Sequence, residues 1–217
     1  MDDGPLDAGD FGSWRKQIAA ALAGEQGSDV PCASCTACCT SSQFVHIAPE
    51  ETDALTHIPG ELLFAAPGLP HGHVLMGYDE RGHCPMLHDG ACSIYAHRPR
   101  TCRTYDCRVF PAAGLVPTEP DKARVARQVE RWRFRFANAG DRVRRDAVRA
   151  AADFVTNHPE LLPSGAGVST QTQLAVLAVE LGDVFVGRDD AGRPARVDPS
   201  EAEVQVAIND VIRRSSR

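Results

Sequence analysis

The sequence predicts an α+β protein in which an irregular cysteine-rich metal-binding head with a small antiparallel sheet precedes a mainly helical region. All eight cysteines lie between residues 32 and 107. Short apolar runs between Gly-, Pro- and Asp-rich turns accompany them, as is typical of short strands. The second half of the chain lacks cysteine and has apolar residues at helical spacing. We expect an N-terminal tail and helix over 1–30, a cysteine-cluster metal-binding domain over 31–110, and a helical C-terminal region over 111–217.

The first half of the chain is expected to contain two short helices and three short strands. Apolar residues at helical spacing predict a helix over 13–23, and a first-turn proline predicts a short helix over 48–55. Between residues 73 and 95, short apolar runs separated by turn residues predict a three-stranded meander. Its second turn, His88-Asp89-Gly90, contains the Asp-Gly pair of a tight hairpin.

Helical spacing dominates the second half. Val125, Val129, Trp132 and Phe136 fall on one face of a predicted helix. A linker is expected over 163–167 and a hairpin or loop over 184–197, and further helices are expected over 143–155, over 170–181 and from 198 onward. Ser200 and Glu203 have the spacing of a capping box at the start of the last helix.

Charge and hydropathy indicate a cytoplasmic protein with no membrane contact. The net charge of -6 argues against a general nucleic-acid coat or a membrane-surface binder. No apolar run approaches the ~20 residues needed to cross a bilayer, and the acidic N-terminus lacks the pattern of a secretory signal. Disulfides are rare in a reducing compartment, where clustered cysteines more often bind metal or perform redox chemistry.

The cysteines form two sets that we predict to be metal ligands. The first set is Cys32, Cys35, Cys38 and Cys39, and the second is Cys84, Cys92, Cys102 and Cys107. Two-residue gaps separate the first three cysteines, which allows their thiolates to turn toward one point. Four cysteines within eight residues, flanked by small polar residues, are not typical of buried apolar packing.

An iron–sulfur cluster, preferably [4Fe–4S], and Zn²⁺ are the two cofactors compatible with these thiolates. Bacterial ferredoxins use the same opening repeat and a later ligand followed by proline, as in Cys84-Pro85. Eight thiolates could instead make two four-sulfur zinc sites, although such sites usually use paired two-residue gaps. The adjacent pair Cys38-Cys39 is awkward for one tetrahedral ion, because neighbouring side chains are expected to diverge.

Residues around the second set are expected to support a negatively charged site. Arg98 and Arg103 lie among these cysteines and are predicted to offset the charge of the thiolates. Tyr95 is a candidate hydrogen-bond donor to the site. The histidines near Cys84 could replace a thiolate, but loop histidines are more often exposed or hydrogen-bonded; these are His71, His73, His83 and His88.

Two sequence blocks resemble the signatures of the YkgJ-like cysteine-cluster family. They are Cys32-Ala-Ser-Cys35-Thr-Ala-Cys38-Cys39 and Cys84-Pro-Met-Leu…Cys92-Ser-Ile-Tyr95…Arg98-Pro-Arg-Thr-Cys102-Arg103. The resemblance covers roughly residues 31–110, and Thr36 departs from the glycine common at that position. It implies a zinc- or iron-chelating domain, often labelled an Fe–S oxidoreductase. Some larger relatives are associated with protein-lysine methylation. The resemblance is therefore also compatible with a role as an accessory protein of a protein-modifying enzyme.

Two functions follow as hypotheses. The first is a metal-binding protein that acts with a redox or protein partner. The second is a zinc-stabilised interaction module that binds protein or nucleic acid through a basic helix. Residues 122–149 contain ten Lys/Arg and three Asp/Glu. We expect the arginines to lie along the edges of an amphipathic helix, on either side of its apolar face. Nucleic acid is therefore not the expected partner, and the expected ion-pair partners are acidic: Glu180, Asp183, Glu201 and Glu203.

Overall fold

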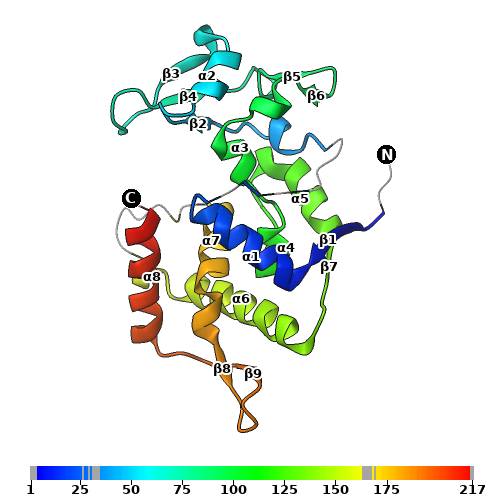
Figure 1. The fold of residues 1–217 in the computed structure, drawn as a ribbon, viewed down its shortest axis with the longest axis vertical. Coiled ribbons are helices and arrows are strands. Elements are labelled where there is room, and N and C mark those ends of the chain that lie inside the picture. The colour runs from blue at the N-terminus through cyan, green and yellow to red at the C-terminus, as the bar shows by residue number, and fades with distance from the viewer. Residues whose placement is uncertain are drawn as a thin grey trace. The chain divides into compact units, whose positions relative to one another are not determined.

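The computed structural model describes residues 4–25, 27–28, 30, 35–162, 168 and 170–215. It forms two compact units, each built from separate segments of the chain (Figure 1). The cysteine unit consists of residues 17–106 and 118–128, and the helical unit of residues 1–16, 107–117 and 129–217. Helices and small antiparallel sheets occur together, which confirms the predicted α+β class.

The cysteine unit contains a three-stranded antiparallel sheet in the order β2-β4-β3. The strands are β2 (Val45–Ile47), β3 (Leu63–Ala65) and β4 (Val74–Met76). In register, Met76 of β4 faces Val45 on one side and Leu63 on the other. Val45, Ile47 and Met76 enter an apolar core that also receives Ala54 from helix α2 (Thr52–His57). This core supports one side of the cysteine site.

A short β-hairpin follows the sheet in the chain, and each of its strands, β5 (Leu87–His88) and β6 (Ala91–Cys92), has two residues. Asp89 and Gly90 at its tip have φ angles of 49° and 76°, the two positive values that an Asp-Gly turn supplies. The predicted turn is confirmed. The predicted meander is wrong in its pairing, because β4 pairs with β2 and β3, where Met76 joins the apolar core. Helix α3 (Arg100–Thr104) follows the hairpin.

The helical unit begins with a parallel pair of strands, β1 (Leu6–Asp10) and β7 (Trp132–Arg135). Helix α5 (Ala123–Arg131) ends before β7 begins, so the prediction of a helix that continues through Phe136 is wrong from Trp132 onward. The alternating sequence Trp-Arg-Phe-Arg suits a strand, and pairing with β1 satisfies the backbone there. Val125, Val129 and Trp132 are buried as expected, whereas Phe136 is partly exposed.

The remaining helices of this unit pack through small residues. Helix α6 contacts α7, and α4 contacts both (Figure 1). Ala147, Ala151 and Ala178 are fully buried, which allows close approach of the helices. Helices α1 (Phe11–Leu22) and α5 (Ala123–Arg131) have residues in both units. The helices and strands of the helical unit that remain to be given are α4 (Val109–Ala113), α6 (Ala139–Asn157), α7 (Gln171–Leu181), the hairpin of β8 (Val186–Arg188) and β9 (Pro194–Arg196), and α8 (Glu201–Ser215).

The helix starts agree with their sequence signals. Thr170 and Gln173 form a reciprocal capping box at α7. Ser200 and Glu203 do the same at α8, where each backbone N–H donates to the other's side chain. The linker expected over 163–167 lies outside the described residues. None of the described helices combines the length and the apolar character that crossing a bilayer requires.

The acidic partners expected for the basic stretch pair elsewhere. Asp183 pairs with Arg15, and Glu180 with Arg214. Glu203 accepts from Ser200 in the capping box, and Glu201 enters no ion pair within the described part of the chain. The expected pairing of the basic stretch with acidic C-terminal residues is therefore wrong, since a local cap occupies the carboxylate of Glu203 and other arginines pair with those of Glu180 and Asp183.

Candidate metal centre

Six cysteine side chains line one cavity of about 100 Å³ in the cysteine unit. They come from the loop and 3-10 turn around Cys38–Thr40, from the loop before β5, from β6 and from α3. They are Cys35, Cys38, Cys39, Cys84, Cys92 and Cys102. The structure therefore brings members of both sequence sets to a single site.

Backbone hydrogen bonds hold the two cysteine sets together. The Cys84 N–H donates to the Cys39 carbonyl oxygen at 2.7 Å. The Ser42 N–H donates to the Gly82 carbonyl oxygen at 2.9 Å. These bonds run from the segment after the first cysteines to the segment before β5, so the main chain sets the distance between Cys39 and Cys84.

The adjacent thiols of Cys38 and Cys39 face each other. The hydrogen bond from the Cys39 thiol is the main cause that lowers the pKa of Cys38 to about 7, and Arg98 contributes with its positive charge. The same hydrogen bond, together with burial, raises the pKa of Cys39. Both side chains line the same cavity, so the expectation that these neighbours diverge is wrong. Both sulfurs can face one bound group.

Burial keeps other thiols of the cavity protonated in the absence of a cation. It raises the pKa of Cys84, and it raises the pKa of Cys102 to about 12, with further contributions from neighbouring cysteine charges. Cys84, Cys92 and Cys102 pack against the apolar core of the unit. A bound cation would replace the protons of these thiols and stabilise the resulting thiolates. Metal binding would therefore be coupled to proton release.

Arg98 is the one predicted charge-offsetting residue that reaches the cavity. It lines the wall, its guanidinium lies 3.6 Å from the centre of the Tyr95 ring, and its Nε donates to the Tyr95 carbonyl at 2.9 Å. Tyr95 contacts Arg98 through its ring and its carbonyl, but its own side chain is exposed and does not line the cavity. Arg103 is exposed, and its carbonyl accepts from Ser28 N–H at 2.7 Å. Tyr105 lines the wall of the cavity.

The remaining two predicted ligands have different positions. Cys107 belongs to the helical unit, where it is buried and its Sγ accepts a hydrogen bond from the Trp132 Nε1–H at 3.2 Å. It is not among the residues that line the cavity. Cys32 lies outside the described residues.

The histidines near Cys84 do not line the cavity either. His73 stacks on His46, with 2.9 Å between the Nδ1 and Nε2 atoms. A group that the sequence interpretation missed is Asp53, His57 and His97, whose ligand-type atoms lie within 4.8 Å of one another. The spacing of Asp53 and His57 on α2, one helical turn apart, was a signal for part of this group.

Comparison with known proteins identifies the cysteine region. Residues 31–127 match the family model described as "CxxCxxCC: Putative zinc- or iron-chelating domain". No curated protein and no solved structure matches the chain significantly. The matched segment includes the predicted ligand Cys32 and every cysteine that lines the cavity.

Proposed function

With residues 31–127 matching a family of zinc- or iron-chelating domains, we propose that the cysteine cavity binds an iron–sulfur cluster, of the [4Fe–4S] type, and that the protein works in redox chemistry or in modification of another protein. The observation that carries this proposal is the convergence of six cysteine thiols on one cavity. Reduced thiols are compatible with the cytoplasmic location expected from the sequence.

The donor set supports a cluster over a single zinc ion. Sulfur ligands select zinc or iron–sulfur groups, whereas oxygen ligands suit magnesium or calcium. Among the described residues that line the cavity, none is a carboxylate or an imidazole. Six thiols are enough for the four ligands that either a tetrahedral zinc ion or a [4Fe–4S] cluster takes. The two-residue gaps between Cys32, Cys35 and Cys38, and the later Cys84-Pro85 pair, match the ligand spacing of bacterial ferredoxins and favour the cluster.

The residues around the thiols provide the surroundings that such a group requires. Cys35, Cys38 and Cys84 would hold it, together with Cys32. Arg98 would offset its negative charge, and Met86 and Ile94 would exclude water. An iron–sulfur cluster supplies one-electron transfer, and its potential depends on charge, hydrogen bonds and exposure. Electrons would pass to a redox or protein partner.

Anaerobic purification tests this proposal. We expect a brown protein that contains iron and acid-labile sulfide, whose visible absorption bleaches on reduction with dithionite. A colourless protein that contains zinc and no sulfide would contradict the cluster. That result would favour a zinc-stabilised interaction module, which would contact its partner through the basic stretch over 122–149. The exposed His71→Ala variant serves as a control, because His71 does not line the cavity.

A further inference from the structure

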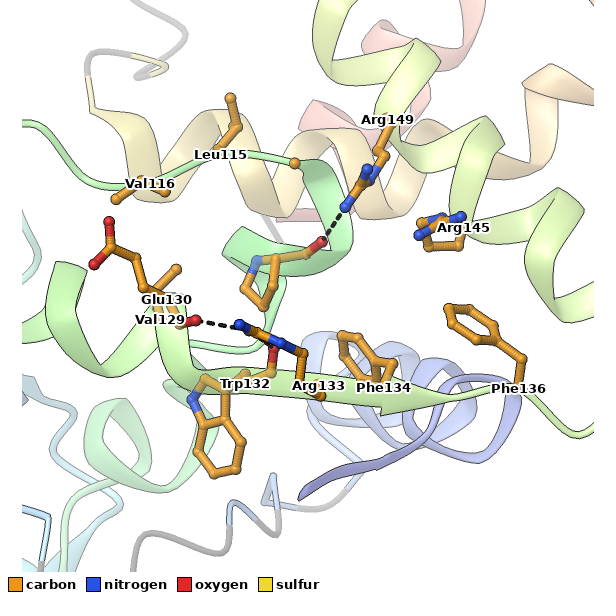
Figure 2. A pocket seen from close by; sticks show the side chains of 12 residues that line it. Leu115, Val116, Val129, Glu130, Trp132, Arg133, Phe134, Phe136, Arg145 and Arg149 are labelled. Carbon is orange, nitrogen blue, oxygen red and sulfur yellow. Dashed lines mark hydrogen bonds between the residues drawn. The ribbon is translucent and has the colours of Figure 1, made fainter. Parts of the chain in front are cut away.

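The helical unit contains an open cavity of about 440 Å³ that is separate in composition from the cysteine site. Strand β7 and the residues after it supply Phe134 and Phe136 to one side (Figure 2). Helix α6 supplies Arg145 and Arg149 to the other side (Figure 2). The volume lies within the range of about 300–1,000 Å³ that is typical of small-molecule sites.

Positive charge dominates this cavity. Arg133, Arg145 and Arg149 line it with a single carboxylate, that of Glu130. Arg133 Nη1 donates to the carbonyl oxygens of Glu130 and Trp132 at 2.6 and 2.9 Å, and both of these acceptors are uncharged. Within the described part of the chain, a carboxylate pairs with only one of the three guanidiniums: Asp146 with the Nε of Arg145, at 2.7 Å.

Arg149 is held in place by its surroundings. Its Nη2 donates to the Pro111 carbonyl at 3.4 Å (Figure 2). Its stem crosses Gly114, where an added Cβ would lie 3.3 Å from the Arg149 Cγ. Gly114 also ends α4 with a φ of 74°, so a side chain there would be unfavourable for both reasons. Desolvation and the charge of Arg145 lower the pKa of Arg149 against the opposing charges of Asp146 and Asp153, and an anion bound at the guanidinium would offset this shift.

Aromatic and aliphatic side chains form the rest of the wall. The Arg145 guanidinium lies 5.2 Å from the centre of the Phe136 ring, within the range of a cation–π contact. Leu115 and Val116 follow α4 on the same cavity (Figure 2). The site thus offers guanidinium forks next to an apolar surface, which suits a ligand with one anionic end and one apolar end.

We propose that this cavity binds an organic monophosphate, with the phosphate held by the three arginines and an aromatic or apolar body placed against Phe136, Leu115 and Val116. Guanidinium groups bind phosphate oxygens through paired hydrogen bonds, which a lysine cannot reproduce. The cavity size favours a small ligand over a polynucleotide, which would need a groove that follows the backbone. This inference does not depend on the metal in the cysteine unit.

Calorimetric titration of the metal-loaded full chain tests the site. The probes are phenyl phosphate, adenosine monophosphate, inorganic phosphate and adenosine. We expect saturable 1:1 binding of at least one of the two phosphate esters, tighter than that of inorganic phosphate, and no binding of adenosine. The Arg149→Gln variant should weaken ester binding by about tenfold or more, since hydrogen bonds to charged groups are strong. Arg149→Lys should restore less than half of that loss in free energy, because it keeps the charge without the fork.

The control is Arg213→Gln, which removes the same charge from an exposed position on α8 and should leave the affinity unchanged. Circular dichroism of each variant checks that the helical unit is folded. Equal affinities of wild type and a folded Arg149→Gln variant would overturn the proposal, as would absence of binding for both esters. Tighter binding of a single-stranded oligonucleotide than of adenosine monophosphate, with a steep salt dependence, would also overturn it.

Discussion

Cys102 and Cys107 are five residues apart in the sequence and have different surroundings. Cys102 lines the cysteine cavity, and burial raises its pKa to about 12. Cys107 is buried in the helical unit and accepts a hydrogen bond from the Trp132 indole. A cysteine of the first kind would gain a metal as its partner under the proposed function, whereas one of the second kind already has a hydrogen-bond donor and an apolar environment.

Replacement of these two cysteines by serine should therefore have different effects. We expect Cys102→Ser to lower the metal content, because Cys102 lines the wall around the thiols proposed to hold the metal and packs against the apolar core of the unit. Cys107→Ser should keep the wild-type metal content and lose about 1 kcal/mol of stability through a weaker buried contact. Elemental analysis and thermal unfolding measure the two effects. Metal loss in a folded Cys107→Ser protein would make Cys107 a ligand, as the sequence pattern first predicted.

At the scale of elements, the turn before β5 positions the second cysteine set. Gly82 has a φ of 75°, and its carbonyl accepts the Ser42 N–H. A Cβ at Gly82 would lie 2.3 Å from the Ser42 Oγ. Gly90, at the tip of the β5–β6 hairpin, has a φ of 76° but open space around it. The two glycines share a conformation and differ in their neighbours.

This contrast gives a matched pair of variants. Both Gly82→Ala and Gly90→Ala should cost about 1–2 kcal/mol, because an L-residue is strained at positive φ. Only Gly82→Ala should also displace Ser42 and disturb the segment that joins Cys39 to Cys84. We expect Gly82→Ala to lose metal faster than Gly90→Ala when a chelator is added, by several-fold in rate. Equal loss rates would show that the Ser42–Gly82 contact has no part in holding the metal.

For the whole molecule, the two units should respond differently to removal of metal. The cysteine unit has a small apolar core of short strands and one short helix, so metal binding should supply much of its folding free energy. The helical unit has its own buried residues, including Ala147, Ala151 and Leu181. We therefore expect the helical unit to stay folded when the cysteine unit loses its metal.

Hydrogen exchange with mass spectrometry can test this difference. After anaerobic chelation, we expect amides of β2, β4 and α3 to lose protection while those of α6 and α7 keep it. The metal-loaded protein incubated without chelator is the reference. A simultaneous loss of protection in α6 and α7 would mean that the two units unfold as one cooperative structure.

The sequence by itself determined the features that depend on residues close together in the chain. The Asp89-Gly90 turn, the Thr170–Gln173 and Ser200–Glu203 caps and the buried positions Val125 and Val129 follow from local conformational preference and helical period. The clustering of cysteines likewise predicted a metal-binding domain, in agreement with the family match over 31–127.

Only the tertiary structure decided which distant segments meet. Trp132 to Arg135 have a spacing compatible with a helix, yet they form β7 because the β1 backbone is available as a partner. The contact of Cys39 with Cys84, the placement of Cys107 beside Trp132, and the hydrogen bond from Arg149 to the Pro111 carbonyl join residues far apart in the chain. The physical reason is that the order of residues in the sequence constrains local conformation, such as turns, caps and the apolar face of a helix. The pairing of strands and the packing of helices depend instead on which other segments can satisfy backbone hydrogen bonds and bury apolar surface.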